Sequence, residues 1–170
     1  TFGRHIDAEN IGVSGFSFGG FTALAVTGGP FLGQDVTAHD PRITASVAVA
    51  PWVGNRNTFR EFFAFGEDNR GLSKVTAPTL VFYGTEDRNT TGKTILPAVE
   101  QLGGPRYVVE FMDQTHDLDD GAWEDRNNWE LLFFKAYLKQ DVEALETLRS
   151  GNGFKGGSID RQVFEFQSSP

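Results

Sequence analysis

The stretch ENIGVSGFSFGGFTALAVTGGP, residues 9–30, decides the fold, and Ser17 lies near its centre. Ile11 and Val13 predict a short buried strand, and the glycines on either side of the serine predict a tight turn. Residues 21–26 contain alanine and leucine and predict the start of a helix. The stretch therefore predicts a strand, a turn that carries a serine, and a helix.

This arrangement suits a serine that acts as a nucleophile. A serine hydroxyl is a poor nucleophile unless it is held exposed, beside a base, at a strained bend. At Gly15 and Gly19 the missing Cβ atoms are expected to let the helix cross back over the strand, and Gly20 is expected to widen the same gap. The backbone N–H of Phe18 is expected to donate to a developing oxyanion, aided by the positive end of the helix. The alternative for Ser17 is a helix N-cap in a glycine-rich turn.

Outside this stretch, short apolar runs alternate with segments of helical pattern. The predicted strands are residues 43–50, 78–83 and 107–111, and the predicted helices are residues 58–65, 91–102, 125–138 and 141–148. Pro97 predicts a late start or a kink in its helix. Residues 163–166 predict either an edge strand or an ordered arm. Strands that are apolar without alternation predict an α/β fold, a parallel sheet with helices on both faces.

Composition limits the classes of function. The 170 residues fit one domain, and a net charge of −8 with a pI near 4.8 argues against nucleic acid as a partner. The chain has no cysteine and hence neither a disulfide nor a thiolate metal site, and it has no apolar run of membrane-spanning length. The composition does not indicate a cellular compartment. Four phenylalanines are expected either to fill the core or to line an apolar pocket: Phe59, Phe62, Phe63 and Phe65.

Three chemically active residues follow three of the predicted strands. In a parallel α/β sheet, functional groups collect at the carboxyl ends of the strands. Ser17 follows the first strand, Asp87 the third and His116 the fourth, which is the order of nucleophile, acid and base expected with this kind of serine turn. Asp87 has the alternatives of capping the next helix or yielding its place to Glu86, and His116 has that of a solvated loop residue.

With these motifs the chain resembles the carboxyl-terminal half of the α/β-hydrolase superfamily, over about residues 10–138. The motifs that carry the resemblance are residues 15–20, 78–87 and 114–117. The chain is most similar to the branch that holds dienelactone hydrolases, platelet-activating-factor acetylhydrolase-like esterases and cutinase-type polyester hydrolases. The resemblance implies that residues 1–140 form part of a hydrolase domain, followed by a short helix and a glycine-rich tail in residues 141–170. It also implies that Phe16 and Trp52 contact the substrate, the alternative for Trp52 being a core tryptophan at a strand end.

In that superfamily several strands precede the serine turn, and a loop after an early strand supplies a second oxyanion donor. Only ten residues precede Ile11 in this chain. A sheet of four parallel strands would leave the apolar serine strand at an open edge. The sequence therefore leads us to expect amino-terminal strands that are missing from this chain, and an upstream segment or a second chain that completes the sheet.

The expected activity is that of a serine hydrolase that cleaves a small or polymeric carboxylic ester through an acyl-enzyme, with no metal or cofactor. One alternative is a peptidase similar to prolyl oligopeptidase. Those enzymes usually show an apolar residue and a proline shortly after the acid turn, whereas this chain has Arg88-Asn89-Thr90-Thr91. The other alternative is a non-catalytic half of a hydrolase-like fold that serves in binding.

Overall fold

A computed structural model describes residues 6–31, 36–54, 65–118, 121–151 and 161–166, and only the backbone at residues 67, 121 and 161–166. The elements in chain order are β1 (Ile11–Phe16), α1 (Phe18–Val26), β2 (Ile43–Val49), η2 (Glu67–Lys74), β3 (Thr79–Gly84), α2 (Gly92–Val99), β4 (Arg106–Phe111), α3 (Gly121–Leu138), α4 (Val142–Ser150) and β5 (Arg161–Phe166). The predicted strands are confirmed to within one residue at most ends.

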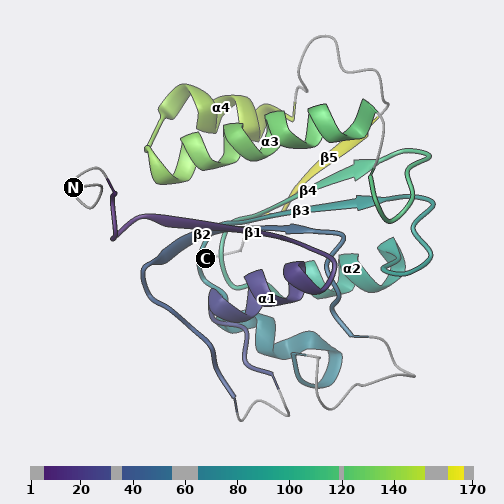
Figure 1. Ribbon diagram of the computed structural model, residues 1–170, viewed down its shortest axis with the longest axis horizontal. Helices are drawn as coiled ribbons and strands as arrows, with labels where there is room; N and C mark the ends of the chain where they lie inside the picture. Colours follow the sequence, from purple (N-terminus) through teal and green to yellow (C-terminus); the bar gives the residue numbers. More distant parts are fainter. Residues whose placement is uncertain (1–5, 32–35, 55–64, 119–120, 152–160, 167–170) are drawn as a thin grey trace.

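The strands form one sheet in the order β1-β2-β3-β4-β5. The first four strands are parallel, and β5 runs antiparallel to β4 at the edge. The α/β class predicted from the sequence is thus confirmed, and residues 163–166 belong to an edge strand. Because β1 to β4 are parallel, their carboxyl ends and the residues that follow them lie along one side of the sheet (Figure 1).

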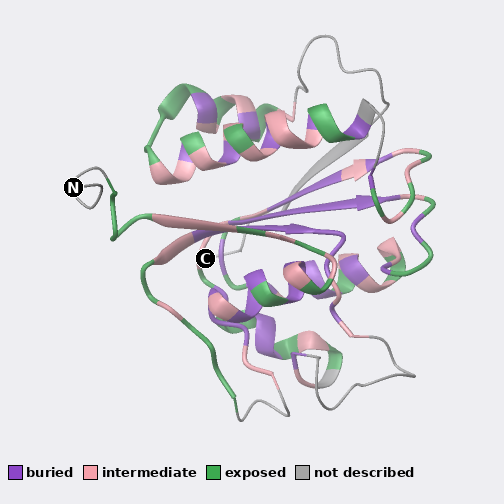
Figure 2. Ribbon diagram, in the orientation of Figure 1, coloured by how far each residue is buried: buried purple, intermediate pink, exposed green. Residues whose placement is uncertain are grey.

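Helices cover both faces of the sheet, as predicted. Helices α1 and α2 lie with η2 on one face, and α3 and α4 lie on the other (Figure 1). Successive residues of β2 point to opposite faces: Ala48 packs with Phe21 and Ile95 in one core cluster, whereas Val47 packs with Trp129 in the other. All of β3 and most of β2 are buried, which explains why these strands are apolar without alternation (Figure 2).

Helix ends were the least accurate part of the prediction. Helix α1 begins at Phe18, directly after the serine, and α3 begins at Gly121, four residues earlier than expected. Of the two expectations for Pro97, the late start of α2 is wrong, because α2 begins at Gly92 and contains Pro97. The helix predicted over residues 58–65 lies almost wholly outside the described residues. Its last residue, Phe65, is fully buried and stacks on Phe21, so it fills the core instead of lining a pocket.

β1 is less buried than the other parallel strands. It lies at one end of the sheet and pairs only with β2 among the described strands. None of its six residues is fully buried, in contrast to β3, where all six are (Figure 2). At the other end of the chain, α4 contributes Ala144 and Leu148 to the same core cluster as α3. The described helices include none with both the length and the apolar character needed to cross a membrane.

Candidate active site

Ser17 lies at a strained turn between β1 and α1. Its φ of 55° and ψ of −114° belong to a region that non-glycine residues rarely adopt. The end of β2 holds this turn from both sides, because the Ser17 N–H donates to the carbonyl of Val49 at 2.8 Å and the Trp52 N–H donates to the carbonyl of Ser17 at 3.0 Å. The serine side chain is thereby presented at the carboxyl end of the sheet.

Two of the three glycines near Ser17 allow a close backbone approach. A Cβ at Gly15 would lie 2.1 Å from the carbonyl oxygen of Gly19, and a Cβ at Gly20 would lie 2.8 Å from Cα of Pro51. The expectation for Gly19 is wrong, since a Cβ there would meet nothing within 4 Å. The backbone of Gly19 is the group that passes close to Gly15, and its own missing side chain would point into open space.

These two positions form a matched pair for a stability measurement. Gly15→Ala is expected to lower the free energy of unfolding by about 1–3 kcal/mol, because the added methyl group collides with backbone. Gly19→Ala is expected to raise it by about 0.5–1 kcal/mol, because alanine costs less backbone entropy than glycine inside a helix. Urea denaturation followed by circular dichroism measures both. Equal destabilisation by the two variants would contradict the close approach at Gly15.

Asp87 lies in the turn after β3 and is 3% exposed. Its Oδ1 accepts hydrogen bonds from the backbone N–H groups of Asn89 at 2.7 Å and Thr90 at 2.9 Å, and its Oδ2 accepts one from the Thr90 hydroxyl at 2.7 Å. Burial alone would raise the pKa of Asp87, but hydrogen bonds from His116, Thr90 and Asn89 outweigh burial and hold this pKa below its usual value. Asp87 is therefore a carboxylate at neutral pH.

The loop that carries His116 is fixed to the Asp87 turn by backbone contacts. The Glu86 N–H donates to the carbonyl of Gln114 at 2.9 Å. Gly84 permits this approach, because a Cβ there would lie 2.1 Å from the same carbonyl oxygen. Two residues after the histidine, Leu118 is fully buried in the core beneath α3. The loop thus has an attachment on each side of His116.

The structure brings Ser17, His116 and Asp87 together in one chain of hydrogen bonds. His116 Nε2 lies 2.9 Å from Ser17 Oγ, and His116 Nδ1 lies 2.8 Å from Asp87 Oδ2. The His116 side chain is 15% exposed and that of Asp87 is fully buried. A carboxylate accepts hydrogen bonds only, so Nδ1 carries the proton and Nε2 is left to accept the proton of the serine hydroxyl. This geometry suits the activation of a serine by a general base.

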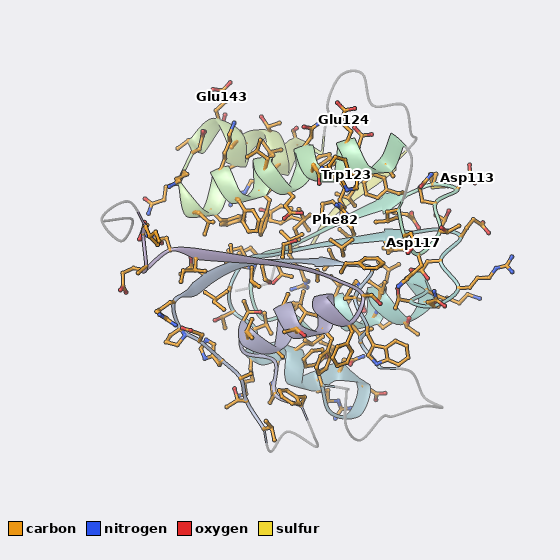
Figure 3. All side chains as sticks on the ribbon, in the orientation of Figure 1. Phe82, Asp113, Asp117, Trp123, Glu124 and Glu143 are labelled. Atoms are coloured by element: carbon orange, nitrogen blue, oxygen red, sulfur yellow. The ribbon has the colours of Figure 1, made fainter. Side chains whose placement is uncertain are left out.

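The structure distinguishes Asp87 from its sequence neighbour Glu86 as the acid that pairs with His116. Glu86 is exposed and lines an open pocket beside the histidine, whereas the carboxylate hydrogen-bonded to His116 is that of Asp87. The pocket has a volume of about 460 Å³ and is lined by Glu86, Arg88, Asn89, Asp113, Thr115, His116 and Asp117. Figure 3 shows Asp113 and Asp117 at this end of the sheet.

The remaining predicted residues lie around Ser17. Phe16 is 41% exposed, and its ring centroid lies 4.9 Å from that of His116. Phe18 is the first residue of α1 and is 50% exposed, so its backbone stands at the amino end of the helix. Trp52 is half-buried and packs against the core cluster of α1 and α2, while its backbone N–H holds the serine turn.

Sequence reasoning missed Thr90 as part of the site. Its position three residues after an aspartate in a turn was the available signal, because such residues often return a hydrogen bond to the aspartate. The described residues contain no group of three or more histidine, aspartate or glutamate side chains placed to hold a metal ion.

Comparison with models of known protein families finds no match for this chain, and comparison with curated proteins finds no match either. The function is therefore inferred from the site itself.

Proposed function

We propose that this chain is a serine hydrolase that cleaves carboxylic esters through an acyl-enzyme. The single observation that carries the proposal is the chain of hydrogen bonds from Ser17 Oγ through the imidazole of His116 to Asp87 Oδ2. The strained backbone of Ser17 supports it independently, because strain of this kind persists where the surrounding structure imposes it and clusters at active sites. An N-capping role for Ser17 has no support, since its side chain makes no cap hydrogen bond to α1.

In the first half of the reaction, His116 Nε2 accepts the proton of Ser17 while Oγ attacks the ester carbonyl carbon. The imidazolium that forms is stabilised by Asp87, whose charge is already present at neutral pH. The carbonyl oxygen becomes an oxyanion, which the backbone N–H of Phe18 at the amino end of α1 is placed to stabilise. The tetrahedral intermediate collapses, the alcohol leaves with the proton from Nε2, and the acyl group stays on Ser17.

In the second half, water replaces the alcohol. His116 Nε2 takes a proton from the water, whose oxygen attacks the acyl carbon, and the second tetrahedral intermediate releases the acid as Oγ regains a proton. The same three side chains, Ser17, His116 and Asp87, serve both halves of the reaction.

The surroundings of Ser17 favour an ester with an apolar portion. The exposed rings of Phe16 and Phe18 flank the serine in the chain, and Phe18 stacks on Phe21 with ring centroids 5.3 Å apart. Exposed aromatic rings beside a nucleophile form an apolar surface that an acyl group or a polymer can pack against. The pocket beside His116, which is lined by polar side chains, then suits the leaving alcohol or bulk water.

The finer fold that we propose is of the α/β-hydrolase type, with further strands beside β1. The support is the open edge of β1, an apolar strand that pairs only with β2 among the described residues and has no fully buried residue. An open parallel edge of this kind is a template for another strand. We propose that an upstream segment of the same protein or a second chain supplies that strand and, with it, a second oxyanion donor.

Covalent labelling tests the proposed function directly. The purified protein is treated with a fluorophosphonate, which reacts with serines activated by a neighbouring base, and intact masses are read under denaturing conditions. We expect one adduct per chain, and none in Ser17→Ala, in which the reactive oxygen is missing. A second polypeptide mass in the same spectrum would identify the partner at the β1 edge.

The outcomes separate the alternatives. No adduct on a folded sample would contradict an activated serine and would favour a binding role for the fold. An adduct together with cleavage of short peptide amides would favour a peptidase, whereas cleavage of esters alone would support the proposal.

A further inference from the structure

Thr90 occupies the centre of the contacts that hold the acid. It is 3% exposed and lies in the loop between β3 and α2. Its hydroxyl oxygen lies 2.7 Å from Asp87 Oδ2, 3.1 Å from the carbonyl oxygen of Ala50 and 3.3 Å from His116 Nδ1. Three of its neighbours therefore belong to three different segments of the site.

The protons available in this cluster fix the direction of each bond. The proton on His116 Nδ1 goes to Asp87 Oδ2, and the Thr90 hydroxyl has a single proton to give. The carboxylate is the strongest acceptor within reach and is also the nearest, so the hydroxyl donates mainly to Oδ2, and the carbonyl oxygen of Ala50 at 3.1 Å shares the same proton as the weaker acceptor. Oδ2 is then held by two donors, and Oδ1 is held by two backbone N–H groups.

The contact with Ala50 links the acid to the nucleophile. Ala50 follows β2 and has a φ of 43°, which turns the backbone sharply. Val49 just before it and Trp52 two residues after it hold Ser17, because the Val49 carbonyl accepts from the Ser17 N–H and the Trp52 N–H donates to the Ser17 carbonyl. The side chain of Thr90 thus touches the same short segment that fixes the position of the serine.

We propose that Thr90 is a positioning residue, whose hydroxyl holds Asp87 Oδ2 opposite His116 Nδ1 and fixes the acid turn against the end of β2 that carries Ser17. The proposal rests on the proposed function for its effect on catalysis. The expected consequence of losing the hydroxyl is a slower chemical step with little change in substrate binding, because Thr90 is buried behind the carboxylate.

Two substitutions separate the hydroxyl from the shape of the side chain. Thr90→Val keeps the branched shape and removes the hydroxyl, and Thr90→Ser keeps the hydroxyl. We expect valine to lower kcat for a nitrophenyl ester about tenfold, the lower end of what a hydrogen bond to a charged group contributes, since both N–H contacts to Oδ1 remain. KM is expected to change less than about twofold, and serine is expected to restore kcat to within about threefold of wild type.

Thr91→Val is the matched control. Thr91 precedes α2, and its hydroxyl lies 3.4 Å from that of Thr94 and is not hydrogen-bonded to Asp87. The Thr91→Val variant loses a hydroxyl, as Thr90→Val does, but at the neighbouring position. Its kcat should therefore stay at the wild-type value. Thermal unfolding of every variant checks that it is folded at the assay temperature, and Thr90→Ala replaces the valine variant if valine does not fold.

A readout that needs no turnover tests the positioning itself. The side-chain carboxyl carbon of Asp87 is followed by NMR as a function of pH in protein labelled with ¹³C-aspartate, with Asp87→Asn to assign the signal. Burial raises the pKa of Asp87, and the hydrogen bond from the Thr90 hydroxyl lowers it. The pKa of Asp87 should therefore rise in Thr90→Val, which lacks this bond, and stay near the wild-type value in Thr90→Ser, which keeps it. His116 is the titratable side chain that is hydrogen-bonded to Asp87 in the described residues, and its ring signals are followed in the same samples.

The activity assay and the Asp87 titration test different proposals, so one can fail without the other. A wild-type protein that neither cleaves esters nor takes up a fluorophosphonate would overturn the proposed function, and the carboxyl titration would still decide the role of Thr90. An unchanged Asp87 titration in Thr90→Val would overturn the positioning role. So would a serine variant as slow as the valine variant, because that result would assign the effect to packing.

Discussion

Replacing His116 by alanine is expected to lower kcat for ester hydrolysis by roughly a millionfold, which is the size of effect seen when the base of a serine triad is removed. The reason is the 2.9 Å contact between His116 Nε2 and Ser17 Oγ. Without the imidazole, no described side chain is hydrogen-bonded to the serine hydroxyl to accept its proton. Fluorophosphonate labelling of Ser17 should fall in parallel, since it depends on the same proton transfer.

His39→Ala is the control for this prediction. His39 is exposed, and its backbone N–H donates to the Thr37 hydroxyl. Its removal should leave kcat within about twofold of wild type, as expected for a surface substitution. Initial rates with a nitrophenyl ester measure both variants. If His116→Ala kept a tenth of the wild-type kcat, the histidine would not be the base.

Asp87→Asn is expected to lower kcat by roughly ten-thousandfold, as the equivalent change does in a serine triad by imposing the wrong histidine tautomer. Here the surroundings decide which way the amide faces. The backbone N–H groups of Asn89 and Thr90 donate to Oδ1 and would keep the amide oxygen there. The NH₂ group would then face His116 Nδ1 and donate to it, so that the ring proton moves to Nε2 and the ring cannot accept the proton of Ser17.

Glu110→Gln is the control for the loss of a carboxylate. Glu110 accepts a hydrogen bond from the Tyr83 hydroxyl at 2.6 Å, which a glutamine oxygen also accepts, and it lies on β4 before the histidine loop. Its kcat should stay within about twofold of wild type. Steady-state rates across pH compare the two variants, and NMR of the His116 ring reports the tautomer directly. A normal tautomer with a full loss of activity would contradict the proposed cause.

The alternation of strands and helices was predictable because it depends on local pattern. β2 and β3 are buried on both faces, and this is why their sequences are continuously apolar and were recognised as strands of a parallel sheet. The helix ends were less predictable. Pro97 suggested a late start or a kink, yet α2 begins at Gly92 and holds Pro97 within the helix, where Ile95 and Ala98 are buried on the same face. Burial of that face outweighs the local cost of a proline.

The site was predictable as a set of residue types in order. Ser17 between glycines, an aspartate after the third strand and a single histidine after it pointed to one group, because parallel strands bring their carboxyl ends together. The sequence left the choice between Asp87 and Glu86 open, because both are acidic residues in the turn that follows the third predicted strand. The structure places Asp87 in the interior, against His116, and Glu86 in solvent.

The sequence by itself determined the strands, the serine turn and the candidate residues, since these depend on apolar pattern, on glycine and on chain order. Tertiary structure alone decided that Gly19 faces open space, that Phe65 fills the core, and that Thr90 joins Asp87 to Ala50. Thr90 and Ala50 stand forty residues apart in the chain. Contacts over such distances leave no periodic trace in a sequence, because packing of the whole sheet and its helices brings them together.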